Sequence, residues 1–429
     1  MKSVIRFRRP ERALAGVTCL LLLTGCTTSD PPEPTLPTAA TSTSAPTIKF
    51  HPDQLVDTAP VKTLKITKAK AVNELQAKPA WEIPDGFFPS AIDPLGRALA
   101  LSTQEIGSSA TRDVALLTPM SIGVMERGEF VKLAESLKDP FGVTGNFDQI
   151  TASDSDGSWV VWVETPSTDL DFQEWVIRAI GPDGQVRELA RSLTLPGGQR
   201  FPDCLGGTKP VILEDWVYWA TAVPTVPSPR VGQPSDWSIS VQRTRLSVAS
   251  GVETVAQGAV MPAVLGDSVV FAQRRLDTPD VYEIRRLLSG GGDELLARGH
   301  VVDGYHLSNL TAGNGTVAWT VGRVVSGETP GAGFLFSLNT RTGGLTRVAL
   351  SSDGGVGGTL AMSRLGPVWG SGSAIGDDGE YLLRVAHGDV IRLAVSEGHG
   401  VVYANPGSAV IGWAEPGEQR PRVFVGEFR

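Results

Sequence analysis

Helix-forming patterns and reactive side chains are both scarce in this chain of 429 residues. It has 3 Cys and 5 His. Outside the N-terminus, no long stretch repeats apolar residues at the 3.6-residue period of a helix. Gly (49) and Pro (30) interrupt nearly every segment, which disfavours long helices. Because helix-forming patterns are scarce, we predict an all-β fold.

Cysteine usage excludes an intrachain disulfide. Cys19 lies in a segment that we expect to be removed and Cys26 in an expected lipidation site, so Cys204 is left alone. A chain of about 400 residues can bury a core large enough to fold without a disulfide. No basic residue near Cys204 in sequence would activate it, so we expect a packed thiol and not a nucleophile.

No motif for catalysis or metal binding stands out. The His residues have no Cys, His or Asp set nearby at ligand spacing, so we predict no metal and no cofactor. The nucleophile elbow Gly-x-Ser-x-Gly is absent. Asp154 and Asp156 carry oxygens suited to calcium, as does the acidic run at 377–380, but neither continues as an EF-type loop. We therefore predict no catalytic residue.

One pattern recurs along the chain: a tight polar turn, then an apolar strand that ends in an aromatic residue. The clearest copy is WVVW at 159–162, after the turn SDSDG, and a weaker first copy, RALAL, lies at 97–101. The other copies are WVYW at 216–219, SVVF at 268–271, TVAW at 316–319, GPVW at 366–369 and AVIGW at 409–413. Successive copies end 61, 57, 52, 48, 50 and 44 residues apart, a period typical of four-stranded propeller blades.

We therefore predict a β-propeller of four-stranded antiparallel blades over residues 58–429, with seven blades and six as the alternative. A pair of β-sandwiches does not produce seven copies of one pattern, and a parallel β-helix repeats at a much shorter period. The aromatic residues that end the copies are expected to pack between blades. They include Trp162, Trp219, Trp319, Trp369 and Trp413.

The stretch SDSDGSWVVWVE…WVIRAIGPDGQVRELA resembles a blade of the TolB-like and WD-repeat-like propeller families. Ser153, Asp156 and Gly157 match the Ser-Pro-Asp-Gly turn of these families, although the proline is absent. The resemblance implies propeller architecture over roughly residues 94–429. Propellers of this kind are mostly interaction platforms, and a fold does not by itself imply a function.

The N-terminus has the order of a signal peptide. Residues 2–12 are basic, residues 13–23 form an apolar core too short to span a membrane, and LTGC ends at Cys26. This tetrapeptide resembles the lipobox of bacterial lipoproteins. The resemblance implies that residues 1–25 are removed and that Cys26 is acylated as the mature N-terminus, on the outer face of the cell membrane.

Residues 26–57 are expected to form a tether rich in Thr, Pro and Ser. Residues 1–25 carry five Lys or Arg and one Glu, so their removal changes the formal net charge from −8 to −12. An acidic body disfavours nucleic acid and anionic lipid surfaces as partners. The lipid must then hold the protein to the membrane, and we expect a monomeric propeller that binds a protein or an envelope polymer.

Loop lengths predict which face of the propeller binds. The first-to-second and third-to-fourth turns of each blade share one face and are short, whereas the other connections share the opposite face and are mostly long. Binding residues commonly lie on loops that a rigid scaffold holds together. The candidate residues for this long-loop face are Asp169, Asp171, Phe172, Arg200, Phe201, Arg230, Arg274, Arg275, Tyr305 and His306.

The last blade has room for only three strands in its own sequence, at 401–404, 409–414 and 422–428. An unpaired edge promotes aggregation, so we predict that N-terminal residues 61–67 supply the fourth strand beside residues 422–428. For the whole chain, the sequence predicts a lipid-anchored extracytoplasmic binding or scaffold protein. The alternative is an extracytoplasmic propeller enzyme, a hydrolase or lyase acting on glycan or peptide.

Overall fold

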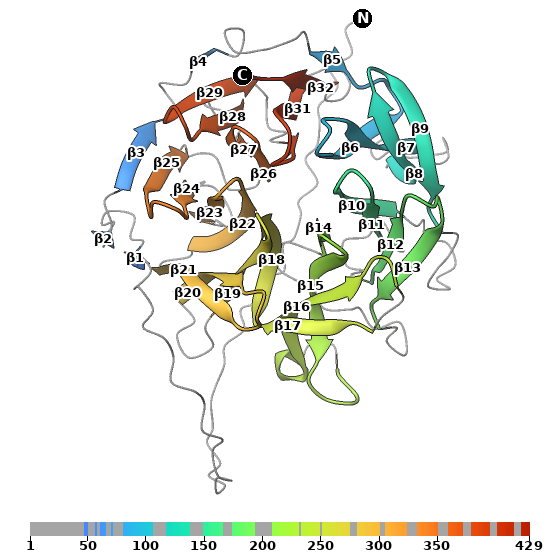
Figure 1. Cartoon of the computed structure of the whole chain (residues 1–429), viewed down its shortest axis with the longest axis horizontal. Coiled ribbons are helices and arrows are strands. Elements are labelled where there is room, and N and C mark those ends of the chain that lie inside the picture. The colour runs from blue at the N-terminus through green and yellow to red at the C-terminus, as the bar shows by residue number, and fades with distance from the viewer. Residues whose placement is uncertain are drawn as a thin grey trace, which may run out of the picture.

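Seven four-stranded antiparallel sheets are arranged around a central axis, as Figure 1 shows. The computed structural model confirms the all-β propeller and its seven blades. The first strand of each blade lies next to the axis, where it contacts the first strands of the neighbouring blades. The structure describes residues 47–49, 56–57, 61–65, 70–71, 80–105, 117–137, 149–165, 174–193, 208–230, 233–248, 251–274, 281–300, 305–323, 333–350, 359–371, 379–394, 401–415 and 422–429.

The blades are numbered along the chain, and their strands are given from the axis outwards. Blade 1 contains β6 (Phe87–Ile92), β7 (Ala98–Glu105), β8 (Leu117–Glu126) and β9 (Glu129–Glu135). Blade 2 contains β10 (Gln149–Ser155), β11 (Val160–Thr165), β12 (Val176–Ile180) and β13 (Val186–Arg191). Blade 3 contains β14 (Val211–Leu213), β15 (Trp216–Pro224), β16 (Trp237–Arg245) and β17 (Glu253–Gln257), with a short 3-10 turn, η4 (Pro234–Asp236), before β16.

The next three blades each gain strands from the N-terminal segment at their outer edge. Blade 4 contains β18 (Ala259–Leu265), β19 (Ser268–Arg274), β20 (Val281–Leu287), β21 (Asp293–His300), β1 (Thr47–Lys49) and β2 (Val56–Asp57). Blade 5 contains β22 (Tyr305–Gly313), β23 (Thr316–Arg323), β24 (Gly333–Asn339), β25 (Leu345–Leu350) and β3 (Val61–Lys65). Blade 6 contains β26 (Leu360–Ser363), β27 (Gly366–Ser371), β28 (Gly379–Arg384), β29 (Asp389–Ala394) and β4 (Lys70–Ala71). Blade 7 contains β30 (Val402–Ala404), β31 (Val410–Glu415), β32 (Arg422–Glu427) and β5 (Trp81–Glu82).

The seven copies of the sequence pattern form or overlap the second strand of each blade, β7, β11, β15, β19, β23, β27 and β31. In blade 2 the side chain of Asp156 and the backbone of Gly157 stabilise the polar turn. The Asp156 carboxylate accepts hydrogen bonds from the backbone N–H groups of Ser158 and Trp159, both at 2.7 Å. Gly157 adopts a φ of 94°, a left-handed value that favours glycine. Strand β11 then runs through the core with five consecutive buried residues.

The hydrophobic core lies between blades, not within them. Its clusters join blades 1 and 2, 2 and 3, 5 and 6, 6 and 7, and 7 and 1, and the largest spans blades 3, 4 and 5. All five Trp residues that end copies of the sequence pattern are at most 2% exposed. Trp319 donates its indole N–H to the Tyr282 hydroxyl of the preceding blade at 2.9 Å. The prediction that these aromatic residues pack between blades is confirmed.

The N-terminal segment runs as a belt around the rim of the ring. Its strands β1, β3 and β4 pair in parallel with the outer strands of blades 4, 5 and 6. In the sequence, prolines precede two of these strands, and proline has no N–H to donate to a ladder. Pro60 directly precedes β3, and Pro79 lies just before β5.

The expected closure by residues 61–67 is wrong, although N-terminal residues do close the ring. Residues Trp81–Glu82 pair with β32, and the N–H of Ile83 donates to the Val423 carbonyl at 2.8 Å. The reason is chain length. Strand β5 is followed within five residues by β6 of blade 1, so the segment next to the first blade reaches the gap with the shortest connection. Residues 61–65 pair with blade 5 instead.

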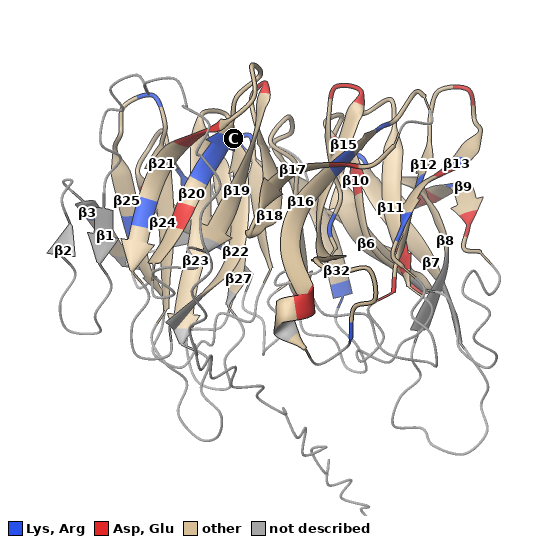
Figure 2. Ribbon diagram, turned by 90° about the horizontal axis from the view of Figure 1, so that it is seen from below, with Lys and Arg blue, Asp and Glu red and all other residues tan. Residues whose placement is uncertain are grey.

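Strand ends divide the propeller into two faces (Figure 2). On the short-turn face, the first-to-second and third-to-fourth connections have two to seven residues. On the long-loop face, the second-to-third connections have six to twelve. Two inter-blade connections are shorter than expected. One residue separates β17 from β18, and four residues separate β21 from β22.

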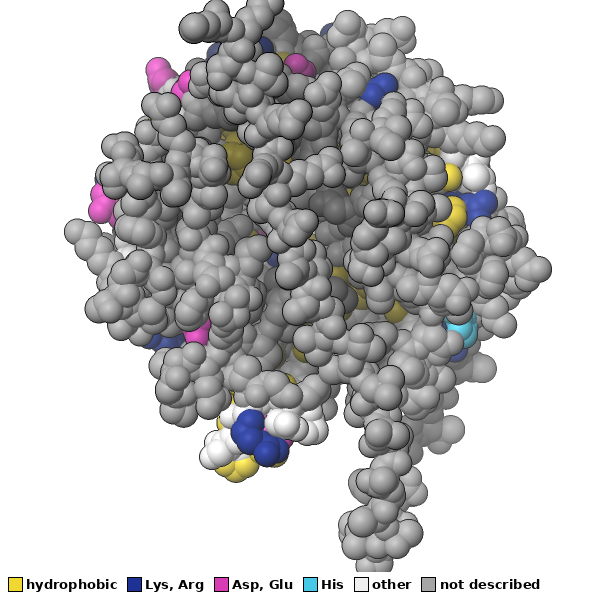
Figure 3. Space-filling view, turned by 180° about the vertical axis from the view of Figure 1, so that it is seen from behind, with side chains coloured by type: hydrophobic (Ala, Val, Ile, Leu, Met, Phe, Trp, Pro, Cys, Tyr) yellow, Lys and Arg dark blue, Asp and Glu magenta, His cyan; other side chains and the backbone are white. Residues whose placement is uncertain are grey.

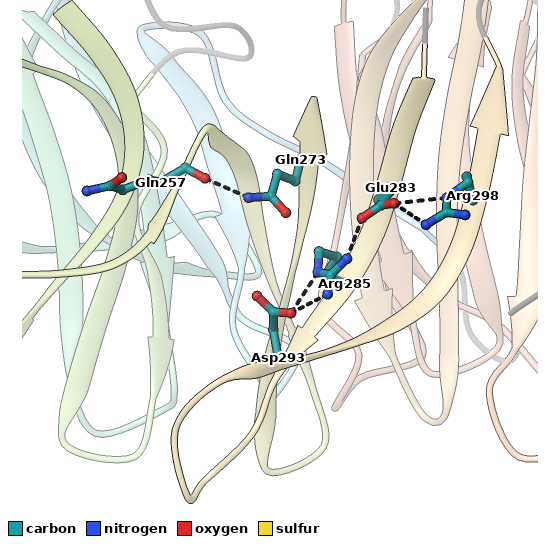
Figure 4. A network of polar contacts seen from close by, with 6 residues as sticks. All are labelled: Gln257, Gln273, Glu283, Arg285, Asp293 and Arg298. Atoms are coloured by element: carbon teal, nitrogen blue, oxygen red, sulfur yellow. Dashed lines mark hydrogen bonds and ion pairs between the residues drawn. The ribbon is translucent and has the colours of Figure 1, made fainter. Parts of the chain in front are cut away.

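A buried ionic cluster in blade 4 stabilises the outer strands (Figure 4). The Glu283 side chain is 3% exposed and accepts hydrogen bonds from Arg298 at 2.6 Å and from Arg285. Arg285 also pairs with Asp293. Burial opposes the ionisation of Glu283, but the hydrogen bonds from Arg298 and Arg285 outweigh burial and hold its pKa below the ordinary 4.5.

The lowered pKa predicts how stability depends on pH. The contribution of Glu283 is fully present above its ordinary pKa of 4.5 and is lost as the pH falls through the lower folded-state pKa. We expect Glu283→Gln to lower the free energy of unfolding by about 1–3 kcal/mol at pH 7, and by less near pH 3. Urea denaturation measures this. The control Glu294→Gln removes an exposed ion pair with Arg286 and should cost under about 0.5 kcal/mol. Equal losses for both variants would contradict the assignment.

The closure predicts a sharp stability boundary at β5. A chain that begins at Ala80 keeps β5, whereas one that begins at Pro84 lacks it together with Ile83, which is 5% exposed. We expect the shorter chain to be less stable by at least about 2 kcal/mol, because it loses a buried isoleucine and exposes the edge of β32. Chemical denaturation of the two chains tests this, and equal stability would show that β5 does not close the ring.

Candidate functional site

Most residues predicted to line the long-loop face lie outside the described residues, and Cys26 does as well. These predicted positions are Asp169, Asp171, Phe172, Arg200, Phe201 and Arg275. The backbones of Arg274, Tyr305 and His306 lie at strand ends on the long-loop side. Among the predicted residues, Arg230 is the one whose side-chain contacts can be followed.

Tyr305 and His306 were expected in the loops of the long-loop face, and the structure corrects this expectation. Strand β21 continues to His300, and β22 begins at Tyr305. Tyr305 pairs with Arg323, and His306 pairs with Gly322. The long β23 gives β22 a full partner, so pairing extends through residues that had been placed in a loop. Tyr305 and His306 therefore belong to the strand that lines the axis.

Arg230 lies in the connection between β15 and β16, which projects from the rim of blade 3 (Figure 1). The two strands pair over nine residues, from Trp216↔Arg245 to Pro224↔Trp237. Beyond this ladder the loop is held by its own hydrogen bonds. The Arg230 backbone N–H and its Nε both donate to the Asp236 carboxylate at 3.0 Å, and the Trp237 indole donates to the Arg230 carbonyl at 3.0 Å.

The same contacts fix the charges in this loop. The Arg230 side chain is 70% exposed, whereas Asp236 is covered by the atoms of its own loop. The hydrogen bond from Arg230 lowers the pKa of Asp236, so both groups are ionised near neutral pH. Val226 is exposed in the same loop. In Figure 3 the projecting part at the lower rim has basic side chains next to hydrophobic ones.

A cavity of about 290 Å³ lies in the channel around the axis. Its walls come from the first strands of blades 2 to 7 and the residues just ahead of β14. Four residues of the short turns, Pro94, Asp156, Asn405 and Pro406, also line it. The cavity therefore lies at the short-turn end of the channel, opposite the face that the loop lengths single out.

Two ionisable groups of opposite sign face this cavity. The Asp154 carboxylate accepts a hydrogen bond from the Ile212 N–H at 2.8 Å. Burial raises the pKa of Asp154 to about 6, against the opposing effect of that bond. Lys209 keeps contact with solvent in the channel, yet the surrounding blades desolvate its ammonium and lower its pKa. In the described part of the chain, no ion pair within 4.0 Å joins Asp154 to Lys209.

Sequence reasoning singled out Asp154 as a possible calcium ligand and did not single out Lys209. Asp154 occupies a position that small or uncharged residues fill in other blades. It pairs with Val161, and the matching positions are Ala263, Thr311 and Ala361. This contrast between blades is a signal that the sequence contains. Lys209 precedes a three-residue strand, and no local pattern distinguishes it.

The cavity has groups that could transfer protons or hold a charged ligand. A carboxyl with a raised pKa beside an amine with a lowered one is a common feature of functional sites. Within the described ranges, however, no Ser or Thr hydroxyl is hydrogen-bonded to Asp154 or Lys209. No group of three or more His, Cys, Asp and Glu residues in those ranges could hold a metal ion.

No helix among the described residues is long and apolar enough to cross a membrane.

No protein-family model matches the sequence, and no curated protein matches it.

Solved structures resemble the chain in fold alone. An oligogalacturonate lyase in complex with manganese matches at 11% identity and a TM-score of 0.46, over 82% of this chain and 92% of that one. The β-propeller domain of the Trilobed protease from Pyrococcus furiosus matches at 10% identity and a TM-score of 0.42, over 68% and 76%. A variant of puromycin hydrolase matches at 14% identity and a TM-score of 0.37, over 71% of this chain. The match spans 53% of that hydrolase.

Proposed function

We propose that this chain is a lipid-anchored extracytoplasmic propeller that binds a protein or an envelope polymer and acts as a scaffold. The observation that carries this proposal is the β15–β16 loop, residues 225–236. It projects from the rim of blade 3, is ordered by its own hydrogen bonds, and exposes an arginine beside an apolar residue.

The order of this loop favours binding over a neutral insertion. An insertion with no role tends to be loose, since loops tolerate added length cheaply. Here the Thr225 N–H donates to the Asp236 carbonyl at 2.9 Å, and the Thr225 hydroxyl donates to the Ser235 carbonyl at 2.8 Å. A loop held in one conformation loses little entropy when a partner docks. Arginine is also enriched at protein interfaces and among their hot-spot residues.

The proposed anchor reaches the propeller through the belt. Cys26 would be acylated, and residues 27–46 would link it to β1 on the rim of blade 4. Twenty residues of a proline-rich tether span roughly 60 Å when extended. This length would let the propeller stand away from the bilayer and present either face to a partner.

An enzyme is the second candidate, a hydrolase or lyase acting on glycan or peptide. The observation that favours it is the Asp154 carboxyl beside the Lys209 amine in the channel cavity. Binding is preferred, because the hydroxyl groups in the described part of the chain make no hydrogen bond to either residue. An activated nucleophile normally has such a bond to its base.

Lipidation is tested by mass spectrometry of the membrane fraction. We expect the mature protein to begin at an acylated Cys26. The Cys26→Ser variant should remain unprocessed or appear in the soluble fraction, because an acyl chain supplies the membrane affinity. A Cys26→Ser protein that is still processed and still held in the membrane would overturn the anchor.

Docking is tested with two exposed valines on opposite faces of blade 3. A photo-crosslinking residue at Val226 lies in the β15–β16 loop, and one at Val248 lies in the β16–β17 turn on the short-turn face. We expect adducts in cells from position 226 and none of the same mass from position 248. Adducts of equal yield from both positions would count against the loop as the docking surface.

Deleting the β15–β16 loop then measures how much this loop contributes to the affinity for the partner. Replacing residues 225–236 by Asn-Gly keeps the β15–β16 ladder and removes the loop. We expect the partner identified by crosslinking to bind at least tenfold more weakly, a loss of about 1.4 kcal/mol. The melting temperature should change by no more than a few degrees, since the loop lies outside the inter-blade core. Unchanged affinity would refute this part of the proposal.

A further inference from the structure

The channel cavity is a second site, separate from the proposed docking loop. It lies at the short-turn end of the axis, whereas the β15–β16 loop leaves from the long-loop face. Its volume of about 290 Å³ is just below the range for small-molecule pockets, roughly 300–1,000 Å³. The cavity can therefore hold a small organic molecule, but not a folded domain.

The charged groups of the cavity wall are Asp154, Asp156 and Lys209. Asp156 is occupied by its own turn, where its carboxylate accepts two backbone N–H groups. Lys209 has three N–H donors, and no acceptor in the described ranges lies within hydrogen-bonding distance of them. Lys209 is exposed to the channel, so its ammonium is available to an anionic group of a ligand.

Asp154 supplies the opposite charge on the neighbouring first strand. The Ile212 backbone N–H holds its carboxylate in place, but no cation in the described part of the chain neutralises it within 4.0 Å. The wall thus presents a carboxylate and an ammonium that do not touch each other. Such a pair is complementary to a small molecule that has both a cation and an anion.

The opposite wall offers hydrogen bonds and apolar contact. Asn405 accepts the Gly407 N–H with its side-chain oxygen at 2.8 Å, which leaves its amide donors for other partners. Thr311 and Met261 also line the cavity. Met261 lies at an irregularity of β18 with a φ of 55°, and β-bulges of this kind re-aim side chains near binding sites. A small side chain of the ligand would pack against these residues.

We propose that the channel cavity binds a small zwitterion of the α-amino acid class, with its carboxylate at Lys209 and its ammonium at Asp154. The proposal is independent of the docking loop. It requires both charges of the ligand, because each one meets a protein charge of opposite sign. A simple anion or a simple amine would meet only one of the two groups, and the other would keep no more than its attraction to its neighbour in the wall.

The test uses the purified mature chain and the twenty common α-amino acids. Each amino acid is screened by saturation-transfer NMR at a concentration of up to about 10 mM. We expect at least one to bind. Its N-acetyl derivative lacks the cation and its amide lacks the anion, so each should bind at least tenfold more weakly by calorimetry. If none of the twenty binds, or if both derivatives bind as well as the parent, the proposal is wrong.

Two variants and a control assign the contacts. Asp154→Asn keeps an acceptor for the Ile212 N–H and removes the charge, and Lys209→Met keeps the length of the side chain. We expect each to reduce the affinity at least tenfold, with melting temperatures equal to or above that of the parent, because each removes a desolvated charge. Asp267→Asn changes an exposed turn on the same face outside the cavity and should leave binding unchanged.

The pH dependence provides a separate readout. Asp154 has a pKa of about 6, so its negative charge is present above pH 6 and is lost as the pH falls below it. Affinity for the bound amino acid should therefore decrease between pH 7 and pH 5, and Asp154→Asn should abolish that decrease. A pH profile that is the same in the parent and the Asn variant would exclude Asp154 as the ammonium contact.

Discussion

Burial between neighbouring blades is the interaction on which the rest of the structure depends. A twisted four-stranded sheet has two apolar faces, and in this ring each is covered by the next blade. Tryptophan supplies much of this contact. Burying one such side chain is worth about 4–6 kcal/mol by area, an upper estimate. Since net stabilities are typically about 5–15 kcal/mol, no blade could lose its neighbour and remain folded, and the ring must close.

Closure also explains the belt. Once Trp81–Glu82 has completed blade 7, the preceding chain lies along the rim, where the outer strands of blades 6, 5 and 4 offer free edges. Among the described residues, no belt strand pairs with the outer strands of blades 1 to 3. Two of these outer strands, β9 and β13, have paired charges, as in Lys132 with Glu135 and Arg191 with Glu188. Charged side chains on an edge strand discourage further strand addition.

Much of the fold could be predicted, because a blade's second strand has a local signature of turn, apolar run and aromatic residue. That signature located all seven blades. The belt could not be assigned in the same way. Residues 61–65 can pair with any free edge, and which edge is decided by chain length and ring geometry, not by the strand's own residues. The candidate site was harder still. Lys209 acquires its surroundings from several blades, so its environment exists only after the ring has closed.

The charged groups that stabilise the blades have more hydrogen-bond partners than Asp154 and Lys209 have in the channel. Glu164 is fully buried and accepts three donors, from Trp162 at 2.7 Å, Arg178 at 2.6 Å and Leu137 at 2.7 Å. Its charge is satisfied within the blades, so it needs no ligand to explain it. Lys209 has no comparable set of partners in the described part of the chain. Its side chain is exposed to the channel, where a cavity of about 290 Å³ gives a small ligand access to it. An ammonium held in a cavity without a hydrogen-bond partner among the described residues is the feature of this channel that points to a ligand.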